Sequence, residues 1–344
     1  MDEVITLAHG AGGGQTSDLI HSIFKKYLNN PYFTADDAAV LPIPGAQPDT
    51  AFESTGHIAM TTDGFIVSPA EFPGGDVGRL AVCGTVNDLS CMGARPRFLT
   101  CSFVIEEGFP VAKLDRIVKS MAETAKEAGV CFVAGDTKVA GKGQVDGLFI
   151  TTAGIGAVME GVHLSGKNAR PGDAVIVTGD IGRHGCAILL ARNEFGIEAD
   201  VTSDDAPLWD AAESMLKTTK DIHVLRDATR GGVGTVLYEI AKESGVGVRI
   251  DREKIPVDPA VSGVCGMLGL EPLYLACEGR FVCFAPAEHA EKLVRVLREG
   301  KYSKGAAVIG EVTEEPVGRV TIRTEIGSET LLPPPGGELL PRIC

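Results

Sequence analysis

The segments HIAMTTDGFIV (residues 57–67) and DVGRLAVCGTVNDLSCM (residues 76–92) decide the fold class of this chain. The first is rich in β-branched residues and is typical of a strand, whereas the second spaces its apolar residues as a helix does. The same alternation continues with strand-like runs at 97–107, 130–136 and 148–158 and a helical run at 111–129. We therefore predict an α/β domain over residues 1–159.

A second domain is expected after a turn-rich stretch at residues 160–173, which contains Arg170-Pro171-Gly172-Asp173. A new alternating series follows. It opens with AVIVTGD, and it predicts helices beginning near Gly182 and at 206–219, 233–244 and 287–298, and strands at 247–250, 280–285, 306–312 and 317–323. A chain of 344 residues also exceeds the size at which a single core usually stops growing. We predict a second α/β domain over residues 160–330, which places the whole chain in the mixed α/β (α+β) class.

The last segment, LLPPPGGELLPRIC (residues 331–344), differs from both domains. Its three consecutive prolines forbid a helix, and Gly336-Gly337 supplies a pivot, so a flexible tail is expected. From Pro333 to the terminal Cys344, an extended chain reaches roughly 40 Å at about 3.3 Å per residue. A cysteine there cannot fill a core, and an exposed thiol is open to oxidation. We therefore interpret Cys344 as a functional thiol that can enter an active site and leave it.

Composition excludes several classes of function. The formal net charge of −14 argues against a nucleic-acid partner, because such a partner requires a basic surface. No apolar run approaches the roughly 18 residues of a membrane span, and the N-terminus is acidic where a signal peptide is basic. The nine cysteines form no CxxC pair, so most are interpreted as small buried apolar residues in a reducing compartment. A cytoplasmic protein without a membrane partner is expected.

Aspartates recur at the ends of expected strands or just before expected helices, in Asp36-Asp37 and at Asp63, Asp88, Asp136 and Asp227. Carboxylates at such positions are suited to hold Mg²⁺ while the ion bridges nucleotide phosphates. A single Asp beside a glycine is more often only part of a turn. Five such places in one chain favour a metal–nucleotide site.

The glycine-rich segment HGAGGGQTSD (residues 9–18) is a candidate phosphate-binding loop. Its backbone N–H groups, including those of Gly12 and Gly13, can face phosphates, and the polar residues after them can cap a helix. The segment matches neither the P-loop pattern nor the dinucleotide pattern. A less common ATP-binding architecture is therefore required.

The motifs ADDAAVL (35–41), TTDG (61–64), GTVNDLSCMGA (84–94), GDTK (135–138) and RDATRGG (226–232) carry a family resemblance. In this order they resemble the superfamily of aminoimidazole ribonucleotide synthetase, selenophosphate synthetase and thiamine-monophosphate kinase. With PRIC at the end, the chain is similar to the hydrogenase maturation factors of the HypE family. The resemblance implies an N-terminal sheet that pairs with its twin across a homodimer, and ATP held through Mg²⁺ near that interface.

The resemblance also assigns residues to the nucleotide site. The metal and phosphate ligands it implies are Asp37, Asp63, Asp88 and Asp136. The nucleotide pocket it implies is completed by Asn87, Thr137, Asp227 and the glycine-rich segment with Gly12 and Gly13.

The activity that the family implies is dehydration of a carbamoyl group on Cys344 to a thiocyanate. The carbamoyl oxygen takes the γ-phosphoryl group of ATP and then leaves as phosphate. Such a reaction requires a cation at the phosphoryl group and a base for the amide nitrogen. Lys138 and Arg230 are the candidate cations, and Glu278, flanked by apolar runs that raise its pKa, is the candidate base.

The implied partners are a carbamoyltransferase that loads Cys344 and an iron-carrying hydrogenase maturation complex that accepts the cyanide. Two alternatives stay open. One is a small-molecule kinase or selenophosphate synthetase of the same superfamily, although the glycine-rich segment lacks a cysteine and a kinase needs no terminal one. The other is a nucleotide-gated carrier that only shuttles a modified thiol. Formation of ADP by the carbamoylated protein would separate these readings.

Overall fold

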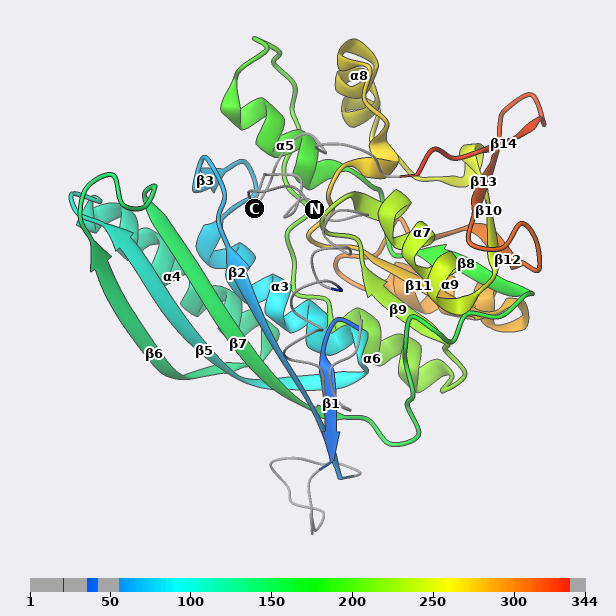
Figure 1. Cartoon of the computed structure of the whole chain (residues 1–344), viewed down its shortest axis with the longest axis horizontal. Coiled ribbons are helices and arrows are strands. Elements are labelled where there is room, and N and C mark those ends of the chain that lie inside the picture. Colours follow the sequence, from blue (N-terminus) through cyan, green and yellow to red (C-terminus); the bar gives the residue numbers. More distant parts are fainter. Residues whose placement is uncertain (1–20, 22–35, 43–55, 335–344) are drawn as a thin grey trace.

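The computed structural model describes His21 and residues 36–42 and 56–334. Within these segments two sheets lie side by side, with helix α3 (Val77–Cys91) between them (Figure 1). Gly12, Gly13 and Cys344 lie outside the described residues. Among the described helices, none combines the length and apolar character that crossing a bilayer requires.

The first sheet has five strands in the order β1-β2-β7-β5-β6. Neighbouring strands are antiparallel except β5 and β6, which are parallel because α4 connects them. The strands are β1 (Ala39–Pro42), β2 (His57–Phe65), β5 (Ala94–Glu106), β6 (Cys131–Ala140) and β7 (Leu148–Val158). A small hairpin of β3 (Glu71–Phe72) and β4 (Gly75–Asp76) leads into α3.

Helices α3 and α4 (Val111–Ala128) cover one face of this sheet (Figure 1). The carboxylate of Asp76 caps α3 by accepting hydrogen bonds from the N–H groups of Gly78 and Arg79, at 2.7 and 3.0 Å. The helix lies very close to the sheet, since a Cβ on Gly154 of β7 would come within 2.6 Å of Thr85. Almost every residue of α3 is buried, so this helix belongs to the cores of both halves of the chain.

The second sheet has seven strands in the order β14-β13-β10-β12-β8-β11-β9. They are β8 (Asp173–Val177), β9 (Val224–Asp227), β10 (Gly247–Asp251), β11 (Phe281–Pro286), β12 (Ala307–Thr313), β13 (Val320–Arg323) and β14 (Glu329–Leu331). Only the β10–β13 pair is parallel. Alternating strands and helices usually form parallel sheets, but here each helical connection joins two strands that are not neighbours, and other strands lie between them.

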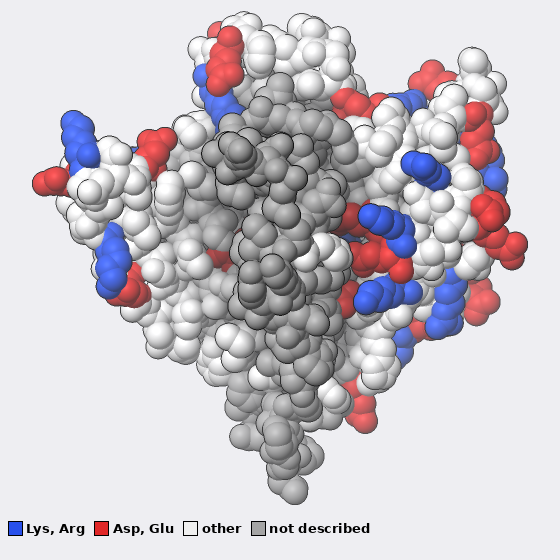
Figure 2. Space-filling model, viewed as in Figure 1, with Lys and Arg blue, Asp and Glu red and all other residues white. Residues whose placement is uncertain are grey.

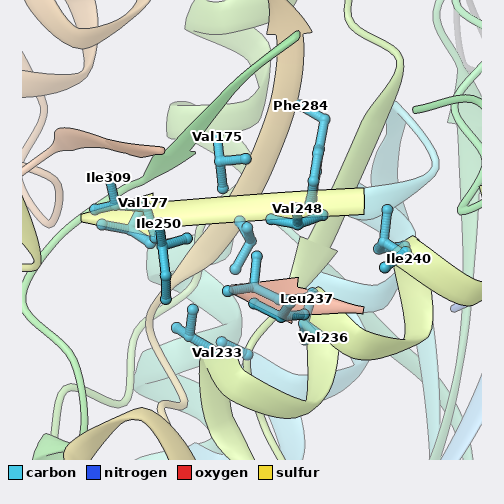
Figure 3. Packing of buried hydrophobic residues seen from close by; sticks show 14 of the residues in the cluster. Val175, Val177, Val233, Val236, Leu237, Ile240, Val248, Ile250, Phe284 and Ile309 are labelled. Carbon is cyan, nitrogen blue, oxygen red and sulfur yellow. The ribbon is translucent and has the colours of Figure 1, made fainter. Parts of the chain in front are cut away.

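Helices cover both faces of the second sheet, so its inner strand β8 is buried throughout. Val175 and Val177 face α7 (Gly232–Ser244) in the core that Figure 3 shows. Ala174 and Ile176 alternate with them and face α6 (Trp209–Thr218) and α9 (Ala287–Glu299). Such a strand is apolar on both faces, as AVIV (residues 174–177) is.

The helices expected at 206–219, 233–244 and 287–298 are confirmed within three residues as α6, α7 and α9, and the helix near Gly182 is α5 (Arg183–Arg192). The structure adds α8 (Pro259–Leu268), which packs against α5. It also adds two short 3₁₀ helices, η3 (Arg252–Lys254) and η4 (Pro272–Tyr274). The mixed α/β class predicted from the sequence is confirmed.

Candidate functional site

A cavity of about 240 Å³ lies where α3, the first sheet and the loop after β9 meet. Five carboxylates line it, namely Asp37, Asp63, Asp88, Asp227 and Glu278. Arg230 and the hydroxyl-bearing Thr61, Thr62 and Thr229 complete most of its polar wall. The structure thus brings six of the predicted site residues together from segments far apart in the sequence.

Crowding and burial raise the pKa of these carboxyl groups. Burial raises the pKa of Asp37 to about 7, although Arg226 opposes the shift. Asp227 is raised to about 6 for the same reason, again against Arg226. Burial, together with repulsion from Asp227 and Asp37, raises the pKa of Asp88 well above its usual value. A bound cation would relieve this repulsion.

The carboxylates are held by separate elements of the chain. Asp63 projects from β2, the strand that also carries Thr61 and Thr62 of the cavity wall. Asp88 projects from α3 and accepts a hydrogen bond of 2.8 Å from the hydroxyl of Thr61. Asp37 precedes β1, and Asp227 ends β9. Oxygen donors converging in this way fit a hard divalent cation such as Mg²⁺.

Arg226 is the cation that stabilises the acidic wall. It is only 8% exposed, and its Nη1 lies 3.1 Å from Oδ1 of Asp37. Its Nη2 lies 3.6 Å from Glu239 and 3.8 Å from Glu243, both on α7. The sequence motifs do not single out Arg226, although it is the first residue of RDATRGG. Its guanidinium pairs with Asp37, so this side chain neutralises an acid of the cavity wall.

A tight turn positions Glu278. Its N–H donates to Oδ1 of Asp204 at 3.2 Å, and the N–H of Gly279 donates to Oδ2 at 3.3 Å. A Cβ on Gly279 would come within 1.9 Å of the carbonyl oxygen of Asp204, so only glycine fits here. Burial, followed by repulsion from Asp205, raises the pKa of Glu278 well above its usual value. The shift of the pKa expected from the sequence thus has the expected direction and cause.

Asn87 is not among the residues that line the cavity. Its side-chain amide donates to the carbonyl oxygens of Ala206 and Glu278, at 3.1 and 3.3 Å, and accepts from the N–H of Leu208 at 2.8 Å. This buried side chain therefore fastens α3 to the second half of the chain and fixes the backbone at Glu278.

The GDTK motif lies elsewhere in the chain. Asp136, Thr137 and Lys138 belong to the edge strand β6, are exposed, and are absent from the cavity wall. Lys138 pairs with Asp136 at 2.9 Å, with exposed side-chain fractions of 70% and 60%. Within one chain, the structure therefore does not join this motif to the other predicted site residues.

Comparison with known proteins assigns the chain to a protein family. Residues 35–158 match the N-terminal domain, and residues 170–323 the C-terminal domain, of the AIR synthase related proteins. Carbamoyl dehydratase HypE of Azotobacter vinelandii is 44% identical over 99% of this chain and 97% of its own length. The chain belongs to the HypE family of carbamoyl dehydratases.

Solved structures agree with this assignment to the HypE family. A chain of the HypE–HypF complex has a TM-score of 0.85 and 48% identity, covering 92% of this chain and 99% of that one. Hydrogenase maturation protein HypE in complex with ATP has a TM-score of 0.80 and 44% identity, covering 99% of this chain and 100% of that one.

Replacing Asp88 by Asn should stabilise this HypE-family protein in the absence of metal. The pKa of Asp88 is higher in the folded protein than in the unfolded chain. As the pH rises from the unfolded-state pKa to the folded-state pKa, the unfolded chain loses its proton first, so the free energy of unfolding falls. The Asn variant avoids this cost while keeping an acceptor for Thr61. We expect its free energy of unfolding in urea to exceed that of the wild type by at least about 1 kcal/mol at pH 8, and by less at pH 5.

Asp136→Asn is the matched control, because Asp136 is exposed and its pKa is lowered by Lys138. This variant should gain no stability at either pH. An Asp88→Asn protein no more stable than wild type at pH 8 would show that the carboxylates do not repel one another as the structure indicates.

Proposed function

We propose that this chain is an ATP-dependent carbamoyl dehydratase that acts on its own C-terminal cysteine, Cys344, to supply cyanide for the iron centre of [NiFe]-hydrogenase. The observation that carries this proposal is 44% identity to a carbamoyl dehydratase over 99% of this chain, combined with a cavity whose acidic wall suits a metal–nucleotide complex. A relative of the same fold has been solved with ATP.

The nucleotide is assigned to the cavity between α3 and the loop after β9. Asp37, Asp63 and Asp88 would hold Mg²⁺ through carboxylate oxygens, with Asp136 joining them from a second subunit. Mg²⁺ supplies neutralisation of the phosphate charge. Asp227, Asn87 and Thr137 are assigned to the nucleotide pocket together with Gly12 and Gly13, and Asn87 would act there through the backbone that it fixes.

The proposed reaction splits into a phosphoryl transfer and an elimination. The carbamoyl oxygen attacks the γ-phosphorus of ATP and ADP leaves. The C–O bond of the O-phosphorylated intermediate then breaks, phosphate departs, and the nitrogen loses its two protons to give S–C≡N. The balance is therefore carbamoyl thioester and ATP to thiocyanate, ADP and phosphate. Such chemistry depends mainly on positioning and charge neutralisation.

Glu278 is assigned as the base that takes a proton from the carbamoyl nitrogen. A carboxyl group with a raised pKa is a stronger base than an ordinary surface glutamate once it has ionised. Asp204 and Gly279 fix its backbone, so the carboxyl group is held at the cavity wall. Arg230, also on the wall, is assigned to the developing charge on the phosphoryl group.

The root of the tail is anchored to the second half of the chain. The side chain of Leu332 is 2% exposed and joins the core beneath α7. The hydroxyl of Tyr238 donates to the carbonyl of Leu332, and that of Tyr274 donates to the carbonyl of Pro333. Tyr274 ends η4, four residues before Glu278. The chain beyond Pro333 would therefore begin from a fixed point, with Cys344 at its end.

A homodimer would complete the site. Strand β6 is the outer strand of its sheet, and Val133 and Val139 on it are 60% and 71% exposed. On the face shown in Figure 2, few charges lie over β7, in contrast to the mixed charges over the second sheet. Met60 and Phe98, at 46% and 36%, are also exposed on this sheet. A twin sheet packed here would carry Lys138 towards the cavity of the partner subunit.

The partners follow from the proposed chemistry. A carbamoyltransferase would load Cys344, and the solved HypE–HypF complex is a related assembly. An iron-carrying hydrogenase maturation complex would accept the cyanide. We place these steps in the cytoplasm, because the described cysteines are all free thiols. The domains we propose are 1–159 for ATP binding and dimerisation, 160–330 for the second domain, and 331–344 for the tail.

Replacing Cys344 by Ala should abolish thiocyanate formation without affecting the fold, because the residue is a substrate. The protein is incubated with its carbamoyltransferase, carbamoyl phosphate and ATP, and the C-terminal peptide is analysed by mass spectrometry. The wild-type peptide should gain a carbamoyl group and then lose one water. The variant should show neither change but keep its ATP affinity and melting temperature. A carbamoyl group found on another cysteine would refute the proposal.

Mixed dimers test whether Lys138 and Glu278 act across subunits. Glu278→Gln should slow dehydration by roughly 10²–10⁴-fold, and Lys138→Ala should cost about 3 kcal/mol of transition-state stabilisation. A dimer with one chain of each variant has one complete pocket if the two residues come from different chains. It should regain up to about half of the wild-type rate. A mixed dimer as inactive as its parents would place both residues in the same chain's pocket.

Releasing the root of the tail should slow dehydration without affecting ATP binding. In the Tyr238→Phe, Tyr274→Phe double variant the tail loses two hydrogen bonds, so Cys344 spends less time near the cavity. We expect a rate about two- to ten-fold lower in single-turnover measurements, with the KM for ATP unchanged. Tyr302→Phe, which loses a hydroxyl contact to Glu127 instead, is the control. A rise in KM matching the loss of rate would indicate a general structural defect.

A further inference from the structure

A thiol lies directly against the acidic wall of the cavity. Cys91, the last residue of α3, is fully buried, and its sulfur lies within 4.8 Å of ligand oxygens of both Asp37 and Asp227. These two oxygens also lie within 4.8 Å of each other. Three ligand atoms from three separate elements therefore converge on one point. From the sequence, Cys91 is expected to be a small buried apolar residue, although it follows Asp88 by three positions and so lies on the same side of the helix.

The chemistry of this group differs from that of a magnesium site. Mg²⁺ prefers oxygen ligands throughout and has little affinity for sulfur. A thiolate with two carboxylates is instead a ligand set for Zn²⁺ and other divalent transition metals. Three protein ligands leave the fourth position of a tetrahedral ion for water or a phosphate oxygen.

The surroundings allow an ion to enter. Arg226 now pairs with Asp37, but it also lies near Glu239 and Glu243, so it keeps partners if a cation displaces it. Ion binding would deprotonate the thiol, and the proton would pass to solvent. The two carboxylates and the thiolate then carry three negative charges, and the ion two positive ones.

We propose that Asp37, Cys91 and Asp227 form a second metal-binding mode of this cavity, which takes a thiophilic divalent cation such as Zn²⁺. Since Asp37 is also assigned to Mg²⁺, and Asp227 to the nucleotide, the two modes exclude one another. Zn²⁺ would therefore inhibit the binding of Mg·ATP. This competition rests on the proposed function, whereas the binding of Zn²⁺ through Cys91 does not.

The experiment uses Co²⁺ and Zn²⁺ as probes of the full-length protein. Co²⁺ bound to a thiolate gives a sulfur-to-metal absorption band in the near ultraviolet. We expect the band in the wild type, and at least about ten-fold weaker Co²⁺ binding without the band in Cys91→Ala. Cys344→Ala and Cys131→Ala, which remove thiols outside the cluster, should keep both. Mg·ATP binding should stay unchanged in Cys91→Ala, which also shows that this variant folds.

X-ray absorption on the wild-type protein with one equivalent of Zn²⁺ requires no substitution at Cys91. One sulfur at about 2.3 Å together with oxygen neighbours is expected, and Cys344→Ala should give the same spectrum. A shell of oxygen and nitrogen alone would overturn the proposal. So would a cobalt band that persists in Cys91→Ala or disappears in Cys344→Ala. If the sulfur is found but Zn²⁺ leaves Mg·ATP binding unaffected, the metal site stands and the assignment of Mg²⁺ to Asp37 fails.

Discussion

Burying several carboxylates around one cavity is costly, because desolvation and mutual repulsion both favour their neutral forms. The rest of the structure is arranged to hold that charge in place. Asp37 and Asp227 keep Arg226 as a buried counter-charge, and α7 brings two further acids to the same guanidinium. Helix α3, buried on nearly all sides, cannot move away from the repulsion that Asp88 experiences. Two apolar cores on either side of the second sheet provide the stability that this site lowers.

The second constraint is the connection between the two halves of the chain. A cavity built from both requires their separation to be fixed, and Asn87 does this by bonding to backbone groups of the second half. Arg79 of α3 adds a hydrogen bond of 2.9 Å to the carbonyl of Asp205. Since Asp205 follows the Asp204 that orients Glu278, these bonds form one continuous path from α3 to the proposed base. Asn87, which was predicted to bind nucleotide, thus fixes the backbone of the site without lining the cavity.

The sequence predicted elements better than it predicted their arrangement. The helices at 233–244 and 287–298 have strong periodicity and a clear amphipathic stripe, so their limits were found within a residue. Strand β9 and helix α8 were missed, because four residues give no period and PAVSGVCGML lacks a polar face. Strand order depends on contacts between distant segments, which a local pattern does not contain. Likewise, the aspartate motifs indicated the acidic cavity, but nothing local revealed Arg226 or Cys91 beside it.

The charges around the cavity of one chain also affect which parts of the proposed reaction each subunit can supply. The cavity wall carries five carboxylates, while the nearby cations among the described residues are Arg226, already engaged with three acids, and Arg230. Transfer of a phosphoryl group develops negative charge, so a wall of this kind is poorly suited to it unless more positive charge arrives. Lys138 is exposed on the outer strand β6, where it pairs with the exposed Asp136, and it is available to supply that charge. Under the proposed function, a single subunit would bind the nucleotide's metal and present the base. The reaction itself would wait for a second subunit and for the loaded tail. Such a division would keep ATP from being hydrolysed while no carbamoyl group is present.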